Sequence, residues 1–190
     1  MKTHHIVIGA AMAAAAVGCA ATAADDVQYG AALTARFAFL WFIAAWSASS
    51  LAQLWPGGWR TRLLRRRRAV GLSFAASHFV HLGFVIATLS AGGERSLITF
   101  VFGGAAYGLI AAMALTSTDG ARKAMGPQRW KLLHSIGGWY VAFIFANSYV
   151  GRLLSEDKML VGAFGTSLLA LAVGLRIAAF AKGRMRLQAA

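Results

Sequence analysis

Six long apolar stretches are the feature of this sequence that most restricts its fold. A helix needs roughly 20 apolar residues to cross the hydrocarbon core of a bilayer, and each stretch is close to that length. The stretches are Ile6–Ala24, Phe37–Trp55, Ala69–Ser90, Leu97–Thr118, Leu132–Gly151 and Met159–Leu175. Because backbone polar groups in lipid must be hydrogen-bonded within the protein, the sequence predicts an all-α fold. We expect one domain over residues 1–190, a bundle of six transmembrane helices, and not a soluble protein.

The charged residues are few, and most of them are basic. They make up 13% of the 190 residues, whereas 58% of the residues are hydrophobic and the net charge is +13. About 25% charged residues is usual for a soluble domain. The basic residues lie between the apolar stretches, which argues against a groove for nucleic acid. The composition therefore predicts that the partner of this surface is the lipid bilayer.

The distribution of charge predicts how the chain crosses the membrane. If the N-terminus is cytoplasmic, 15 of the 19 Lys and Arg residues fall on the cytoplasmic side, and five of the six acidic residues fall on the other. The cytoplasmic set is Lys2, Arg60, Arg62, Arg65, Arg66, Arg67, Arg68, Arg122, Lys123, Arg129, Lys131, Arg176, Lys182, Arg184 and Arg186. The positive-inside rule then predicts that both termini and two basic loops, 60–68 and 119–131, are cytoplasmic. We expect Arg176, at the end of the sixth stretch, to extend its side chain to the membrane surface.

Residues 1–24 allow two interpretations. They form either an uncleaved first helix, which we favour, or a cleaved signal peptide, because Lys2 precedes an apolar run that ends in the small residues Ala21, Thr22 and Ala23. The other five helices keep their orientation under either interpretation. Cys19 is the one cysteine, so an intrachain disulfide and a cysteine-ligated metal cluster are excluded.

Three histidines in or beside apolar stretches are the candidate functional residues. His78 and His81 are three residues apart on the third stretch and share a helix face, and His134 lies in the first turns of the fifth. Ionisable residues at such positions are costly and usually face the bundle interior. One such histidine more often only hydrogen-bonds a neighbouring helix. Three of them on two helices favour a shared ligand, and neutral imidazole is a common axial ligand of heme iron.

Two pairs of glycines also allow two interpretations. Gly137 and Gly138 follow His134 by about one helical turn, so their lack of side chains either admits the edge of a porphyrin or allows another helix to pack closely. Gly104 and Gly108 form a GxxxG pattern, which is typical of helix packing in membranes. Packing is the better default interpretation for all four.

Two sequence blocks resemble a known family. The first is Arg67-Arg68-Ala69-Val70-Gly71-Leu72 followed by His81, and it resembles the third helix of the ferric-reductase-like transmembrane domain. The second block is similar to the heme-binding membrane subunit of the bacterial periplasmic methionine-sulfoxide reductase system. It consists of Thr116-Ser117-Thr118, Arg122, Met125-Gly126, Arg129-Trp130, Leu133 and His134. The resemblance covers roughly residues 30–180.

The resemblance implies a six-helix bundle that binds a b-type heme and transfers electrons across a bacterial inner membrane. His81 matches the family's histidine on the third helix, and His134 matches the first histidine on the fifth. His78, one turn from His81, is a further candidate ligand. The family usually has a second histidine on the fifth helix where this chain has Asn147, and tends to have an aromatic residue where it has Gly138. One axial bond to the iron is therefore in question.

Three functions follow, of which electron transfer is the leading one. As the resemblance implies, the chain would be the electron-transfer subunit of an oxidoreductase, with a periplasmic reductase or ferric iron as acceptor. Because the sequence has no Gly-rich dinucleotide fingerprint, we expect a separate donor: a quinol, or a reduced flavin supplied by a partner. The alternative is a heme-less membrane scaffold of the same ancestry, which Asn147 favours. A small transporter is less favoured, because the apolar stretches contain neither proline nor carboxylate.

Overall fold

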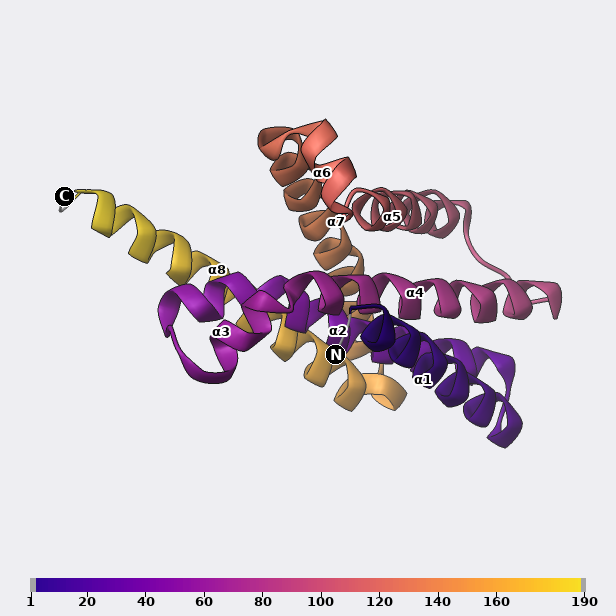
Figure 1. The fold of residues 1–190 in the computed structure, drawn as a ribbon. Helices are drawn as coiled ribbons and strands as arrows, with labels where there is room; N and C mark the ends of the chain where they lie inside the picture. Colours follow the sequence, from indigo (N-terminus) through magenta and orange to yellow (C-terminus); the bar gives the residue numbers. More distant parts are fainter. Residues whose placement is uncertain (1–2, 189–190) are drawn as a thin grey trace. The chain divides into compact units, whose positions relative to one another are not determined.

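The computed structural model describes residues 3–188, except for the side chains of Arg186 and Leu187. Within that range the chain forms eight α-helices, one short 3-10 helix and no strand (Figure 1). The helices are α1 (Thr3–Ala24), α2 (Val27–Leu54), α3 (Gly58–Arg65), α4 (Arg67–Ser90), α5 (Leu97–Leu115), α6 (Asp119–Met125), α7 (Pro127–Leu153), η1 (Glu156–Lys158) and α8 (Met159–Gln188). The all-α prediction is confirmed. Lys2 and the side chain of Arg186, which were counted in the charge distribution, lie outside the described residues.

Five helical segments in the described chain are long and apolar enough to cross a membrane: α1, α2, α4, α5 and Glu156–Met185, which covers η1 and most of α8. They indicate a multi-pass membrane protein. The sixth predicted span lies in α7, which has sufficient length at 27 residues. Its first turn carries Arg129 and Lys131, and its later turns carry Asn147 and Ser148, so α7 is less apolar than the others. The sixth crossing and the orientation of the termini remain predictions.

Each of the two basic connections includes a short helix, which was not predicted from the sequence. α3 (Gly58–Arg65) overlaps the connection at 60–68, and α6 (Asp119–Met125) lies within the one at 119–131. Arg and Leu favour the helical conformation in α3. In α6 the backbone N–H of Ala121 donates to Thr118 Oγ1 at 3.2 Å, which caps the first turn. Gly126 then ends α6 with a φ of +80°, a value that glycine adopts readily.

The chain forms two compact units. Unit 1 contains α1, the first half of α2, α4, α5, α6 and the first half of α7 (residues 3–42 and 68–141). Its core includes the buried hydroxyl groups of Thr34, Ser73 and Ser77, and Ser77 Oγ donates to the carbonyl of Ala10 at 3.3 Å. A Cβ at Gly18 would lie 2.7 Å from the Thr34 methyl group, so glycine allows α1 to approach α2 closely. Small and hydroxyl-bearing residues thus let these helices pack tightly.

α5 and the first half of α7 run antiparallel within unit 1. Trp130 Nε1 donates to the carbonyl of Thr116 at 3.1 Å, and Tyr140 Oη donates to that of Phe102 at 3.1 Å. The GxxxG pair on α5 does not take part. Gly104 and Gly108 are exposed, and no described atom lies within 4 Å of a Cβ built at either. The packing interpretation of this pair is therefore wrong within the chain.

An ion pair joins the starts of α4 and α6 in unit 1. Arg68, at the start of α4, lies 3.0 Å from Asp119, at the start of α6, and both side chains are exposed. Such a surface pair contributes only about 0–1 kcal/mol to stability. The pair does show that the start of α4 and the start of α6 lie close together. The predicted topology places both on one side of the membrane.

Unit 2 contains the second half of α2, α3, the second half of α7, η1 and α8 (residues 43–67 and 142–188). Gln53 Nε2 donates to the carbonyl of Ala179 at 2.7 Å, and Lys182 Nζ donates to that of Leu54 at 2.7 Å. The lysine thereby satisfies a carbonyl at the C-terminus of α2 and complements the helix dipole. Gly165 allows the antiparallel α7–α8 contact, because a Cβ there would overlap the Tyr149 ring.

Arg176 differs from its prediction. The apolar residues that follow it continue α8 to Gln188, so it lies within the helix and not at its end. Its guanidinium Nη1 donates to the carbonyl of Trp46 at 3.0 Å, and its Cζ lies 4.6 Å from the centre of the Trp46 ring. The arginine is therefore held by α2, through a hydrogen bond and a cation–π contact.

Candidate functional site

His81 is oriented by a hydroxyl group from another helix. It is half-buried on α4, and its Nδ1 lies 3.2 Å from Thr34 Oγ1 on α2. Thr34 is fully buried, and its hydroxyl lies 2.9 Å from the carbonyl oxygens of Gly30 and Ala31, to which it can donate. When it donates to one of them, the Thr34 oxygen accepts from His81 Nδ1, which requires the imidazole proton on Nδ1. The lone pair is then on Nε2, the nitrogen through which this neutral imidazole would bind a metal.

His134 is oriented by its own helix. It is half-buried on α7, and its Nδ1 lies 3.0 Å from the carbonyl oxygen of Trp130, one turn earlier. A carbonyl only accepts, so Nδ1 carries the proton and Nε2 the lone pair, as in His81. The imidazole stacks on the Trp130 ring with centroids 4.0 Å apart, and the Trp130 indole is itself bonded to α5. Trp130 therefore holds the His134 ring in place through both its carbonyl and its indole.

His78 lies in a cluster of aromatic rings. It stacks on Tyr107 of α5 with centroids 4.9 Å apart, and it lies 5.3 Å from both Phe74 and His81. The structure thus brings His78 and His81 together on one face of α4, as their spacing predicted. The stack with Tyr107 indicates that His78 joins α4 to α5 by packing.

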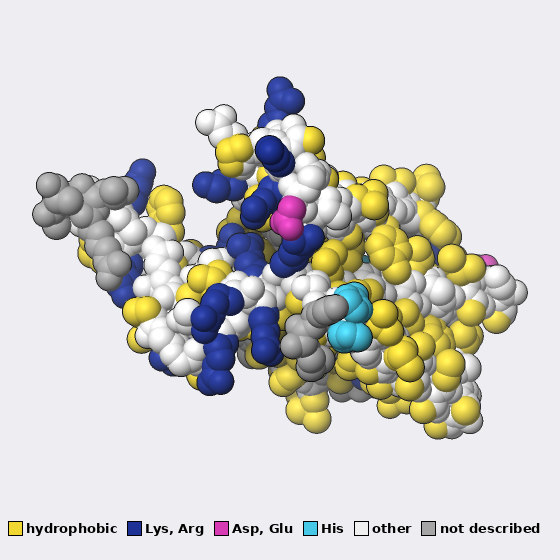
Figure 2. Space-filling model, in the orientation of Figure 1, with side chains coloured by type: hydrophobic (Ala, Val, Ile, Leu, Met, Phe, Trp, Pro, Cys, Tyr) yellow, Lys and Arg dark blue, Asp and Glu magenta, His cyan; other side chains and the backbone are white. Residues whose placement is uncertain are grey.

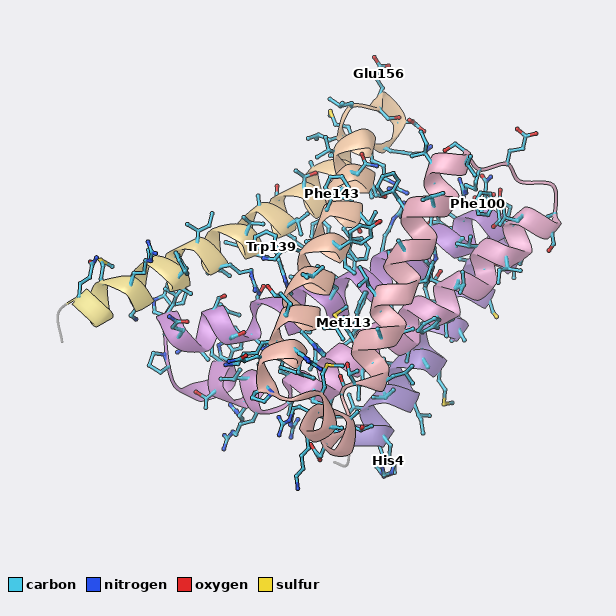
Figure 3. All side chains as sticks on the ribbon, turned by 90° about the horizontal axis from the view of Figure 1, so that it is seen from above. His4, Phe100, Met113, Trp139, Phe143 and Glu156 are labelled. Atoms are coloured by element: carbon cyan, nitrogen blue, oxygen red, sulfur yellow. The ribbon has the colours of Figure 1, made fainter. Side chains whose placement is uncertain are left out.

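Gly137 has a structural explanation that does not involve a porphyrin. A Cβ at this buried glycine would lie 2.6 Å from Met113 Sδ and 2.9 Å from Met113 Cε. The space beside Gly137 is therefore occupied by the thioether of α5, and Figure 3 shows Met113 between α5 and α7. The contact supports the packing interpretation of Gly137, and entry of a porphyrin edge beside this glycine would require the flexible Met113 side chain to move.

Asn147 lies in the second half of α7, in unit 2, and its side chain is exposed. It is the position at which the resemblance would lead one to expect a second histidine on this helix. An amide does not replace imidazole as an ordinary heme ligand.

His81 and His134 are side chains of the type that a b-type heme requires, because its iron takes one or two axial ligands from residues such as histidine. In each ring Nδ1 lies within hydrogen-bond distance of an oxygen, at 3.2 Å in His81 and 3.0 Å in His134, and such a partner orients metal-bound imidazoles in general. Within the described residues, no group of three His, Cys, Asp or Glu side chains could hold a metal ion directly. Heme does not need such a group, because the porphyrin supplies the four equatorial nitrogens.

Thr34 and Met113 are the residues that sequence reasoning missed. Thr34 is 47 residues from His81 in the chain and lies before the predicted second apolar stretch. No spacing rule connects partners on separate helices at that distance. Met113 lies in an apolar run, where methionine is an ordinary packing residue.

Comparisons of the chain with protein-family models, with curated proteins and with solved structures found no match.

Proposed function

We propose that this protein is an integral membrane heme b protein that transfers electrons across the membrane, as the electron-transfer subunit of an oxidoreductase. The observation that carries the proposal is the hydrogen bond from His81 to the buried Thr34 hydroxyl. It places an oriented, neutral imidazole within a membrane-spanning helix, where ionisable residues are otherwise costly. The resemblance to ferric-reductase-like proteins supports the same conclusion.

His81 is the proposed principal ligand of the heme iron, and His134 the second. Their Nε2 atoms would bind, while Thr34 Oγ1 and the Trp130 carbonyl hold the Nδ1 protons and keep the rings oriented. Bound heme supplies a one-electron carrier inside the bilayer. His78 is a further candidate ligand, and its stack with Tyr107 supports a role in positioning α4.

The electron donor and acceptor are proposed to be separate molecules. A quinol or a reduced flavin would deliver electrons on the cytoplasmic side, and a periplasmic reductase would accept them on the other. The bacterial inner membrane is the proposed location. Purified protein expressed with ample heme should give sharp bands in a reduced-minus-oxidised spectrum if iron has two imidazole ligands. A five-coordinate iron would instead change its spectrum with carbon monoxide, and protein without heme under these conditions would overturn the proposal.

A heme-less membrane scaffold is the second candidate, and the exposed Asn147 favours it. The variant Asn147→His separates the two functions. In a heme protein with one open position, the added imidazole should remove the carbon monoxide response and strengthen heme binding. A colourless parent together with a red Asn147→His variant would show that the chain has lost its heme, and the scaffold would then be the correct function.

Both termini are proposed to be cytoplasmic. A single cysteine placed in the segment 92–95, in a Cys19→Ser background, should react with a membrane-impermeant thiol reagent from outside the cell. Cys19 must be replaced first because it is exposed. Labelling only after lysis would reverse the proposed orientation.

A further inference from the structure

α3 has no buried residue, although it is rich in large apolar side chains at its start and middle. Trp55, just before it, is 53% exposed, Trp59 is 54% exposed and Leu64 is 39% exposed. Packing within the protein does not account for these side chains. Tryptophan is enriched where a membrane meets water, because its ring is apolar and its N–H is polar.

The same helix carries exposed positive charge. Arg62, Arg65 and Arg66 are exposed, and Figure 2 shows basic side chains over α3 with hydrophobic ones among them. Arg60 differs: its Nε donates to the carbonyl of Trp55 at 2.6 Å, and its guanidinium lies 5.6 Å from the Trp59 ring centre. Arg60 therefore ties the start of α3 to the two tryptophans, and the other three arginines are available for an external anion.

No acidic residue of unit 2 is close in sequence to Arg62, Arg65 and Arg66. Its described acidic residues are Glu156 and Asp157, which lie in η1. That short helix precedes α8, whereas Lys182, near the other end of α8, bonds the end of α2 where the connection to α3 begins. Along the roughly 35 Å of helix between residues 158 and 182, the acids are far from this end. Within unit 2, therefore, no described carboxylate lies near the charge of α3, and Asp119 of unit 1 is already paired with Arg68.

We propose that α3 is an interfacial helix that binds the phosphate groups of anionic phospholipids. Trp55, Trp59 and Leu64 lie at the boundary of the acyl chains, and Arg62, Arg65 and Arg66 contact the headgroups. The chain connectivity favours lipid over a soluble partner, because α3 is tied by short connections to two membrane-spanning helices, α2 and α4. A short basic helix with aromatic residues, held at that level, has the composition of a membrane-surface helix.

The test uses the full-length protein in vesicles of one fixed mixture of phosphatidylglycerol and phosphatidylcholine. Bromine, which quenches tryptophan fluorescence at short range, is carried by one lipid or by the other. The difference between the parent and Trp55→Phe/Trp59→Phe isolates the signal of the two tryptophans. We expect stronger quenching when the anionic lipid carries the bromine. An arginine near an anionic surface changes binding by about fivefold. The triple variant Arg62→Gln/Arg65→Gln/Arg66→Gln should therefore lower the preference for anionic over neutral lipid by about tenfold or more.

Two matched variants complete the design. Arg62→Lys/Arg65→Lys/Arg66→Lys keeps the charge and should keep the preference, which guards against a general loss of folding in the glutamine variant. Arg122→Gln/Lys123→Gln removes two exposed charges from α6, which lacks exposed tryptophan, and should leave the quenching of Trp55 and Trp59 unchanged. Equal quenching by the two lipids in the parent, or an unchanged preference in the glutamine variant, would overturn the proposal. Absence of quenching by either lipid would assign the surface to a protein partner.

Discussion

Nδ1 of His81 and Nδ1 of His134 each lie close to an oxygen atom, but the two oxygens come from different places in the fold. Thr34 of α2 holds the His81 ring from another helix, whereas Trp130, one turn earlier on α7, holds the His134 ring. The orientation of His134 therefore survives as long as α7 is helical. That of His81 depends on the packing of α2 against α4. The comparison teaches that a nonlocal contact makes one ligand candidate sensitive to tertiary structure, and a local one does not.

Removing the His81 imidazole should have the largest effect. His81→Ala should abolish heme binding, because His81 is the proposed principal ligand of the heme iron. Heme content per chain and the reduced-minus-oxidised spectrum measure this. His78→Phe, on the same helix face, keeps an aromatic ring beside Tyr107 but removes a candidate ligand; we expect it to retain heme, and loss of heme there would assign an iron bond to His78. A full, unchanged spectrum in His81→Ala would show that the ligand assignment is wrong.

Removing the Thr34 hydroxyl tests the contact between α2 and α4 that orients His81. Thr34→Val keeps the shape of the side chain but leaves His81 Nδ1 without this acceptor, so heme affinity should fall about 10- to 100-fold, as for other partners of metal-bound histidines. Thr34→Ser keeps the hydroxyl and should keep most of the affinity. Heme titration of the apoprotein compares the two variants. Equal affinities would mean that the bond does not orient a ligand.

Because the contact that orients His134 lies within α7, we expect substitutions there to have a smaller effect on heme binding. His134→Ala should weaken heme binding or change the spectrum without abolishing it, because His81 remains. Trp130→Phe should change less, since the acceptor for His134 Nδ1 is a backbone carbonyl that the substitution retains. Spectra of both variants under carbon monoxide measure the loss of the second ligand. Complete loss of heme in His134→Ala would reverse the ranking of the two histidines.

The smallest expected effect concerns the contact between α5 and α7. In Gly137→Ala the new Cβ would meet the Met113 thioether at 2.6 Å, and the flexible side chain must move. We expect a loss of about 1 kcal/mol in the free energy of unfolding, the lower end of the range for overpacked sites. Met113→Ala in the same chain should recover part of that loss by making room. Thermal unfolding in detergent compares the single and double variants, and additive losses would contradict the contact.

The sequence by itself predicted a helical chain with six apolar segments, and five of them form helices long and apolar enough to enter a bilayer, because helix length and composition are local properties. It also placed His78 and His81 on one face, since a spacing of three residues decides that in any helix. The bond from His134 to Trp130 follows the same local rule.

Only the tertiary structure decided which residues of different helices meet. Thr34 with His81, Met113 with Gly137 and Arg176 with Trp46 are pairs far apart in the chain, each joined by helix packing. The exposed GxxxG pair on α5 illustrates the same limit, because a pattern of small residues permits close packing without choosing a partner. Helices in a bilayer are formed by local hydrogen bonds, and their neighbours are then selected by shape and by a few polar contacts. Those contacts set the orientation of His81.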